Sequence, residues 1–428
     1  MKFLKEIWGT FKKPLLVVAS FGVIFFVIGT VIPAVRDFIV NQSPIVGIEA
    51  SNKHEYTKNQ TIKPSDFDIF AKHENGKTTK ISDENVKLSV TKPNIVGPTT
   101  EVTLTKNKWS CNVDVKNKRK KIVEFECGKP NKSDVKASVY SNGELAFTGK
   151  GDILVYANND YPWLSYEGQD KYPITSVTFE EEVKPIYMDG YFRGLQELTY
   201  IEYIPDTVES MEEICYECVA LKEAPDLSNC VNLANMTSAF EKCSSLEKAP
   251  KIPASVKVLD KSFADCIELK EGADMSDATG VIKAEGLYYG CNTMNKGELP
   301  PNIKNITSAY ENCINIKQMP YIPETVEIME SAFRGASSMV VATEIPASVK
   351  DVAKCFDGCS KLKGILVING NPTSYSGFLT NAASAANIDL QGSSVMLDIL
   401  ARESNDNPNV TVNGKMPNYD ISYSDMDF

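Results

Sequence analysis

The sequence predicts a transmembrane helix at the N-terminus, then a β-sandwich, then a solenoid of short α/β-type repeats with capping segments. Three observations on the 428 residues support this order. Residues 15–35 carry no charge and are rich in Val, Ile and Phe. Residues 45–130 contain short runs of alternating apolar and polar residues, separated by Asn, Lys, Pro and Gly. Residues 191–364 repeat one pattern about eight times.

The uncharged N-terminal run is long enough to cross about 30 Å of hydrocarbon as a helix. Four lysines precede it, namely Lys2, Lys5, Lys12 and Lys13. The positive-inside rule therefore predicts a cytoplasmic tail (1–13), a transmembrane anchor (14–40) and a C-terminal ectodomain. That ectodomain is extracellular, or periplasmic if the cell has an outer membrane. A cleaved signal peptide is the alternative, but its apolar region normally has only about 7–15 residues, so an uncleaved anchor is favoured.

Residues 41–130 have the regularly spaced short strands that predict an antiparallel β-sandwich. Examples are "VKLSV", "TEVTLT", "WSCNVDV" and "KIVEFEC". The stretch from Tyr56 to Val90 resembles bacterial Ig-like modules, and this resemblance implies a spacer that lifts a binding domain off the envelope.

Two cysteines of this module are symmetric about residue 119, in the polar loop "KNKRKK". A hairpin folded at that loop places Cys111 opposite Cys127, at a cross-strand separation that suits a disulfide. Outside the cytosol such a bridge forms, so a Cys111–Cys127 disulfide is predicted. Two reduced cysteines on a strand pair are the alternative.

The repeats align in three columns, at a spacing of 22 to 25 residues. The reference column holds mostly cysteine: Leu195, Cys218, Cys243, Cys266, Cys291, Cys313, Ala336 and Cys359. Three residues earlier stands an aromatic residue in seven of the eight copies: Phe192, Phe240, Phe263, Tyr288, Tyr310, Phe333 and Phe356, with Cys215 as the exception. Three residues later stands a large apolar residue: Leu198, Leu221, Leu246, Leu269, Met294, Ile316, Met339 and Leu362. A fixed period of this length is typical of a solenoid, in which each coil buries its apolar face only against its neighbours.

The chemistry of one copy indicates how its segments are used. Leu246, Ala249 and Ile252 fit a short strand, and Pro253 ends it because proline has no N–H for a ladder. These residues resemble the BspA-like (Treponema pallidum type) leucine-rich repeats of bacterial surface proteins. The matching elements are the Phe-x-x-Cys-x-x-Leu core, the Ile-Pro step and the Val-x-x-Met spacing at Val208/Met211 and Val326/Met329. The resemblance implies a right-handed solenoid with a concave strand face, and a role in adhesion or surface recognition.

Segments flanking the repeats are predicted to cap them. Residues 131–190 are expected to form the N-terminal cap, and residues 191–364 the repeats. From Ile365 onward the period is lost, so residues 365–428 are expected to form a C-terminal cap and a loose acidic tail.

Composition excludes several kinds of function. The net charge of −11 disfavours nucleic-acid binding. Only two histidines are present, and no nucleotide-binding or zinc-protease motif appears, so neither an enzyme nor a bound cofactor is predicted. Cys215, Cys218, Cys230 and Cys243 could suggest a zinc or redox site, but the repeat already explains two of them as buried packing residues, so no metal site is predicted.

Anchor, spacer and repeats together predict a surface receptor or adhesin that binds a protein or glycan through the repeats. One column, eight residues after the reference, is the candidate recognition surface: Tyr203, Lys251, Tyr321 and Glu344. Exposed tyrosines favour recognition, although these positions also fit ordinary solvent-facing strand residues. Two alternatives stay open: an assembly component, phage-encoded in one version, whose repeats self-associate, and an envelope enzyme with an unrecognised site.

Overall fold

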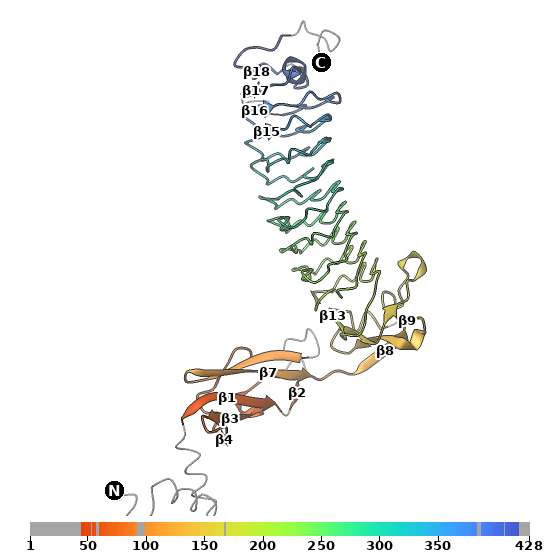
Figure 1. Cartoon of the computed structure of the whole chain (residues 1–428), viewed down its shortest axis with the longest axis vertical. Coiled ribbons are helices and arrows are strands. Elements are labelled where there is room, and N and C mark those ends of the chain that lie inside the picture. Colours follow the sequence, from red (N-terminus) through yellow and green to blue (C-terminus); the bar gives the residue numbers. More distant parts are fainter. Residues whose placement is uncertain are drawn as a thin grey trace, which may run out of the picture. The chain divides into compact units, whose positions relative to one another are not determined.

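The structure is a computed structural model that describes residues 44–52, 54–56, 60–91, 99–166, 168–382, 387–405 and 407–418. The predicted cytoplasmic tail, the transmembrane anchor and nearly all of the acidic tail lie outside these residues. Within the described ranges, no helix has the length and apolar character needed to cross a bilayer. The chain forms two compact units, which divide between Lys118 and Arg119 (Figure 1).

The first unit contains two β-sheets with one shared apolar core. One sheet has the order β1-β3-β4, and the other has the order β2-β7-β6-β5. Their strands are β1 (Ile45–Asn52), β2 (Glu55–Tyr56), β3 (Phe67–His73), β4 (Thr78–Lys80), β5 (Lys87–Leu88), β6 (Thr99–Lys106) and β7 (Trp109–Asn117), with a 3-10 turn at Pro64–Asp66. Alternate side chains of β3 and β6 are buried, among them Phe67, Ile69, Val102 and Leu104, because successive side chains of a strand point to opposite faces.

The predicted hairpin about residue 119 is wrong, and so is the Cys111–Cys127 disulfide. Strand β7 pairs with β6 instead, and this tight turn places Asn107 at φ 55°. Cys111 therefore lies opposite Leu104. Strand β8 (Lys121–Glu126) belongs to the second unit, and Cys127, which follows it, is buried in that unit's core. Both cysteines are free.

The second unit begins with a five-stranded sheet of order β14-β13-β11-β10-β8. Its other strands are β10 (Val135–Tyr140), β11 (Glu144–Gly149), β13 (Ser176–Phe179) and β14 (Tyr200–Ile201), accompanied by the pair β9 (Gly128–Lys129) and β12 (Asp152–Ile153) and by 3-10 turns at Lys132–Asp134 and Ala157–Asn159. Arg119 donates to the buried carboxylate of Glu144 and lies 4.0 Å above the ring of Tyr140. The unit boundary thus precedes the predicted one at residue 130, because residues 119–126 are bound into this sheet.

Aromatic side chains close the N-terminal end of the repeats. Trp163 is fully buried, packs edge-on against Phe147 at 5.0 Å between ring centroids, and donates from Nε1 to the carbonyl of Tyr191. Strand β11 runs parallel to β13, and β13 runs parallel to β14, so the parallel ladder of the repeats starts inside the cap.

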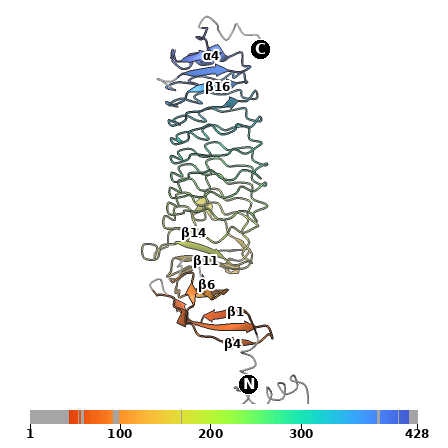
Figure 2. The same cartoon turned by 90° about the vertical axis from the view of Figure 1, so that its left-hand side faces the viewer.

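The repeats stack through two ladders of parallel backbone pairing, as Figures 1 and 2 show for the coils between β14 and β15. The first ladder follows the column of large apolar residues that runs from Leu198 to Leu362. We call the exposed surface of this ladder the strand face. The ladder includes the pairs Glu223–Lys248, Lys251–Asp274, Glu271–Lys296 and Gln318–Val341. The second ladder precedes the aromatic column: Tyr187–Ser210–Asn235–Val258–Lys283 and Asn305–Ile328–Asp351–Ser374.

Each repeat turns around its aromatic residue through two residues with positive φ. One stands two residues before the aromatic column: Gly190, Glu213, Ser238, Lys261, Gly286, Ser308, Ser331, Lys354 and Gly377. The other stands two residues after it: Gly194, Glu217, Lys242, Asp265, Gly290, Asn312, Gly335, Gly358 and Asn381. We call the surface of this segment the turn ridge. Left-handed residues are uncommon outside glycine, so their regular recurrence shows that neighbouring coils impose the conformation.

The aromatic and cysteine columns form the core of the stack. Phe240 and Phe263 are parallel at 5.7 Å between ring centroids, and the stacking continues through Tyr288, Tyr310 and Phe333. Each column cysteine points its Sγ at the carbonyl of the aromatic-column residue one repeat earlier: Cys218 to Phe192, Cys243 to Cys215, Cys266 to Phe240, Cys291 to Phe263, Cys313 to Tyr288 and Cys359 to Phe333, at 3.0–3.2 Å. The thiols therefore act as small apolar residues with a weak S–H donor.

Two tyrosines of the aromatic column allow a matched test of this packing. The hydroxyl of Tyr288 accepts a hydrogen bond of 3.0 Å from the backbone N–H of Ala273, whereas that of Tyr310 is buried with no partner among the described residues. We expect Tyr288→Phe to lower the free energy of unfolding by about 1–3 kcal/mol, because a buried N–H loses its acceptor. Tyr310→Phe should raise it by about 1 kcal/mol, because an unpaired buried hydroxyl is removed. Urea denaturation measures both; changes of the same sign would contradict this assignment.

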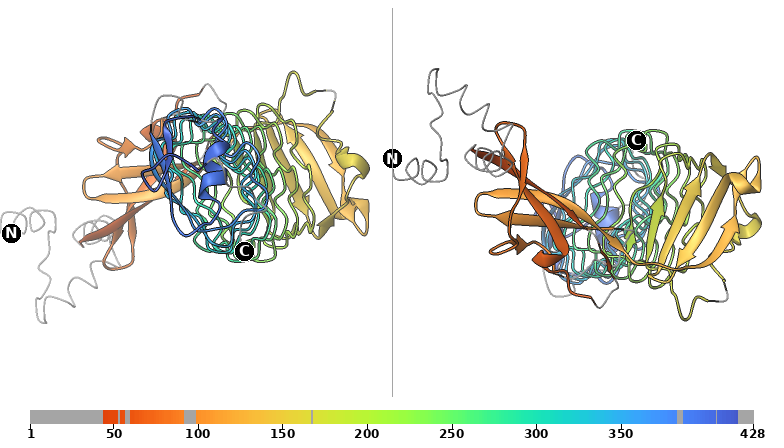
Figure 3. Two further views of the ribbon diagram at one scale, coloured as in Figure 1. Left: turned by 90° about the horizontal axis from the view of Figure 1, so that it is seen from above. Right: turned by 90° about the horizontal axis from the view of Figure 1, so that it is seen from below.

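The array continues beyond the predicted end of the repeats at residue 364. Strands β15 (Glu344–Ile345), β16 (Gly364–Ile368), β17 (Ile388–Gln391) and β18 (Val410–Val412) form one parallel sheet. A further turn has Gly377 and Asn381 at positive φ, with Leu379 between them in the aromatic position. The six-residue helix α4 (Leu397–Arg402) follows β17, and the view from above shows it over the end of the stack (Figure 3). The prediction that the period stops at Ile365 is therefore wrong.

Candidate binding face

The strand face carries the predicted recognition column, and the structure places its four members in different environments. Tyr203 is half-buried; its hydroxyl donates to the carbonyl of Phe179 at 3.1 Å, and its ring leans on that of Phe179. Tyr203 therefore links the segment that follows β14 to the last residue of β13. Lys251 is exposed and forms an ion pair of 2.7 Å with Asp277, which raises the pKa of the lysine.

The remaining two residues of the column are exposed. Tyr321 has 74% of its surface exposed, and no hydrogen bond is formed by its side chain in the described part of the chain. Glu344 begins β15 and accepts a hydrogen bond of 2.5 Å from Nδ2 of Asn369, one repeat later. Tyr321 is thus the column member that best keeps its side chain available to a ligand.

The first half of the strand face is occupied by internal ion pairs. Lys222 contacts Glu247 at 3.1 Å, and Lys248 contacts Glu223 at 2.6 Å, so two reciprocal ion pairs join two neighbouring repeats. Such exposed pairs contribute little stability, but each side chain already has a partner of its own.

The second half of the strand face carries exposed apolar side chains beside the charged Lys317, Glu344 and Lys363. We call Tyr321, Val341 and Ile365 the apolar set; they lie on three successive repeats and are 74%, 44% and 55% exposed. Val341 occupies the position that Glu223, Lys248 and Lys296 occupy in other repeats. Sequence reasoning missed Val341 and Ile365. The signal was present, because Val340-Val341 replaces the charged pairs of earlier copies such as Lys222-Glu223.

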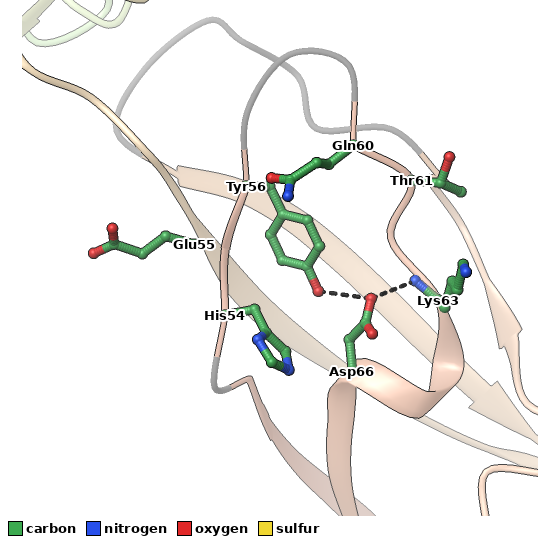
Figure 4. A pocket seen from close by; sticks show the side chains of 7 residues that line it. All are labelled: His54, Glu55, Tyr56, Gln60, Thr61, Lys63 and Asp66. Atoms are coloured by element: carbon green, nitrogen blue, oxygen red, sulfur yellow. Dashed lines mark hydrogen bonds between the residues drawn. The ribbon is translucent and has the colours of Figure 1, made fainter.

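A small polar pocket of about 360 Å³ lies in the first unit, lined by His54, Tyr56, Lys63 and Asp66 among others (Figure 4). The Tyr56 hydroxyl donates to Oδ2 of Asp66 at 2.9 Å, and the backbone N–H of Lys63 donates to the same oxygen at 2.8 Å. Burial raises the pKa of Tyr56 to about 12. These contacts cap the short turn at Pro64–Asp66, so they account for the arrangement without a ligand.

The cysteines considered for zinc or redox chemistry are buried in the core of the repeats. Cys218 and Cys243 point at backbone carbonyls, and Cys230 lies 3.6 Å from the carbonyl of Ile204. Burial raises the pKa values of Cys215, Cys230 and Cys243, which disfavours the thiolates that metals and disulfide exchange require. No group of three potential metal ligands is found in the portion of the chain that the structure describes.

Parallel ladders at a spacing of 22 to 25 residues, with one buried leucine-like and one buried aromatic column, define a leucine-rich repeat protein. The "BspA type Leucine rich repeat region" matches in six copies over residues 169–281 and 281–397, which is more than half of the chain. The chain belongs to this family.

Solved structures of bacterial leucine-rich repeat proteins are similar to this chain at low identity. One from Bacteroides ovatus has a TM-score of 0.40 and 16% identity, and the match covers 63% of this chain and 78% of that one. A leucine-rich cell surface protein from Faecalibacterium prausnitzii has a TM-score of 0.27 and 15% identity, covering 56% and 94%. The pneumococcal vaccine antigen PcpA has a TM-score of 0.30 and 16% identity, covering 64% and 88%. The curated proteins contain no match.

Proposed function

We propose that this chain is a membrane-anchored, surface-exposed binding protein whose repeats recognise a protein or glycan ligand through the strand face. Its family supports a repeat-based binding role. The observation that carries the proposal is the change along the strand face from paired charges to the exposed apolar set. Tyrosine is enriched in binding hot spots, and exposed apolar patches mark interaction sites.

The other units fit this function in supporting roles. The sheets of residues 44–118 would act as an Ig-like spacer, and the uncharged run of residues 15–35 would anchor the chain with its N-terminus in the cytoplasm. The ectodomain would then be extracellular, or periplasmic in a cell with an outer membrane. The array would form a right-handed solenoid, in which a long, repeated surface is available for recognition rather than an enclosed catalytic pocket.

The test is binding of the full-length protein to arrays of host matrix proteins, glycans and envelope polymers. We expect Tyr321→Ser to weaken the binding that is found by about 2 kcal/mol, or roughly thirtyfold in Kd, the usual cost of removing a hot-spot tyrosine. Tyr187→Ser is the control, because Tyr187 is 45% exposed but lies on the second ladder. Equal losses in both variants would contradict the proposal.

The same variants separate binding from assembly. If the protein binds nothing in the arrays but forms oligomers that Tyr321→Ser dissolves, the strand face serves self-association. Sedimentation of the two variants over a range of protein concentrations measures this outcome.

A further inference from the structure

A notch of about 400 Å³ lies on the turn ridge, away from the residues of the apolar set. It is lined by Tyr289, Glu311, Asn312, Arg334 and Asp357 with two glycines, Gly335 and Gly358. The glycines occupy the second positive-φ column on two successive repeats, whereas Glu217, Lys242, Asp265 and Asn312 carry side chains in this column in four of the earlier repeats. A side chain at Gly358 would start in free space, because a Cβ there meets nothing closer than 3.6 Å, whereas the space beside Gly335 is filled by the side chain of Asn312.

Arg334 is held at the centre of this notch by two carboxylates from the neighbouring repeats. Its Nη1 contacts Oε1 of Glu311, and its Nε contacts Oδ2 of Asp357, each at 3.3 Å. Both carboxylates are mostly buried, with 13% and 19% of their side-chain surfaces exposed, whereas the arginine is 47% exposed. The hydroxyl of Ser308 donates a hydrogen bond of 2.6 Å to Oε2 of Glu311, and Nδ2 of Asn381 donates one of 3.3 Å to Oδ1 of Asp357.

This fixed arginine keeps part of its donor capacity for a ligand. Within the described residues, Arg334 contacts its two carboxylates through Nη1 and Nε, and no hydrogen bond engages its Nη2. Tyr289 accepts a long hydrogen bond of 3.4 Å from Nδ2 of Asn312, and its own hydroxyl hydrogen stays available. The notch therefore offers donors from an arginine and a tyrosine beside an aromatic ring.

The charges decide which chemistry fits. Glu311, Arg334 and Asp357 sum to −1, which disfavours an anion, and the central guanidinium disfavours a cation. The polar lining disfavours an apolar ligand, because its burial would leave these donors unpaired. A neutral ligand with several hydroxyl groups satisfies the donors and carboxylate lone pairs, and its C–H face can lie on the ring of Tyr289.

We propose that this notch of the turn ridge binds one unit of a neutral saccharide. The site is separate from the strand face and does not depend on the function proposed for it. On a surface protein, it would give the repeats a second mode of contact with a glycan chain.

The first variant, Gly358→Asn, fills the notch while keeping the backbone. Asparagine holds the same left-handed conformation in this column at Asn312 and Asn381, with φ of 61° and 55°. A Cβ at Gly358 meets nothing closer than Gly335 at 3.6 Å, so the fold tolerates it. The matched control is Gly194→Asn, because Gly194 stands in the same column with nothing within 4 Å of its Cβ position.

The second variant, Arg334→Gln, removes the central donor. Its control is Arg193→Gln: Arg193 occupies the same column of the first repeat and also pairs with a glutamate, Glu213. Circular dichroism checks that all four variants remain folded.

Saturation-transfer NMR of the full-length protein with glucose, galactose, mannose and N-acetylglucosamine, each alone, tests the proposal. We expect saturable transfer from at least one of them, weakened about tenfold or more by Gly358→Asn and Arg334→Gln and unchanged by both controls. Tyr321→Ser should leave this binding intact, which separates the notch from the strand face. The proposal is overturned if none of these sugars binds, or if Gly358→Asn binds as well as the native protein.

Discussion

Replacing Phe263 by alanine is expected to lower the free energy of unfolding by about 3–5 kcal/mol, the usual cost of removing a core aromatic. Its ring is fully buried between Phe240 and Tyr288, at 5.7 and 5.9 Å between ring centroids. The backbone N–H of Phe263 still donates to Leu287, and its carbonyl still faces Cys291, so the loss is one of packing alone. Because each repeat contacts only its neighbours, the cavity interrupts the stack at its middle.

Urea denaturation followed by far-ultraviolet circular dichroism measures this effect. The control is Ile267→Ala, four residues away, where the side chain is 39% exposed and the expected loss is about 1–2 kcal/mol. If Phe263→Ala cost no more than this control, the aromatic stack would not be the core of the array.

The repeat core could be predicted from the sequence because its residues recur in fixed columns. Phe263, Cys266 and Leu269 are all fully buried, as their columns implied. The stop at Ile365 was predicted wrongly because the last turn lacks the marker residues: Leu379 replaces the aromatic residue and Ala382 replaces the cysteine. Both are still apolar and buried, so the coil forms without the pattern that identifies it.

Strand partners were harder to predict than strands. The symmetry of Cys111 and Cys127 about residue 119 satisfied a local rule for hairpins. The two strands have other partners in the structure. Strand β7 pairs with β6 across the turn at Asn107, and β8 pairs with β10 within the second unit. Alternation of apolar residues shows which face of a strand is buried, but it does not choose the neighbour.

The turn ridge left almost no trace in the sequence. Its positive-φ columns contain Gly, Glu, Ser, Lys, Asp and Asn, which share no obvious chemistry. The conformation comes from the backbone pairing of adjacent coils, as in the hydrogen bond from Lys261 to the carbonyl of Glu285. The sequence also did not show which residues of the recognition column are exposed. Tyr203 and Tyr321 stand in the same column, but Tyr203 is held by the carbonyl of Phe179, whereas Tyr321 is exposed and available to a ligand.

Alkaline pH is expected to destabilise the second unit steeply, because its cysteines are buried as neutral thiols. Burial raises the pKa values of Cys127, Cys230 and Cys313 to about 12 and also raises those of Cys266, Cys291 and Cys355. An unfolded thiol ionises near pH 8.5. The stabilisation is therefore complete below that pH, and it is lost as pH rises toward 12, where the unfolded chain binds fewer protons than the folded one. Each such thiol contributes up to about 1.4 kcal/mol per pH unit in this range.

A single substitution measures how much one of these thiols contributes to the pH dependence of stability. Cys313→Ala introduces the residue that the same column already holds at Ala336, so it costs about 1 kcal/mol at pH 7 through the lost thiol contact with Tyr288. Between pH 9 and 11 the variant should lose stability less steeply than the native protein, by about 1.4 kcal/mol per pH unit. Ile316→Val costs a similar amount at pH 7 but changes no titrating group, so its slope should match that of the native protein. Equal slopes for native protein and Cys313→Ala would mean that this thiol already ionises in the folded state, and the thiol column would then be a site of reactivity rather than of packing.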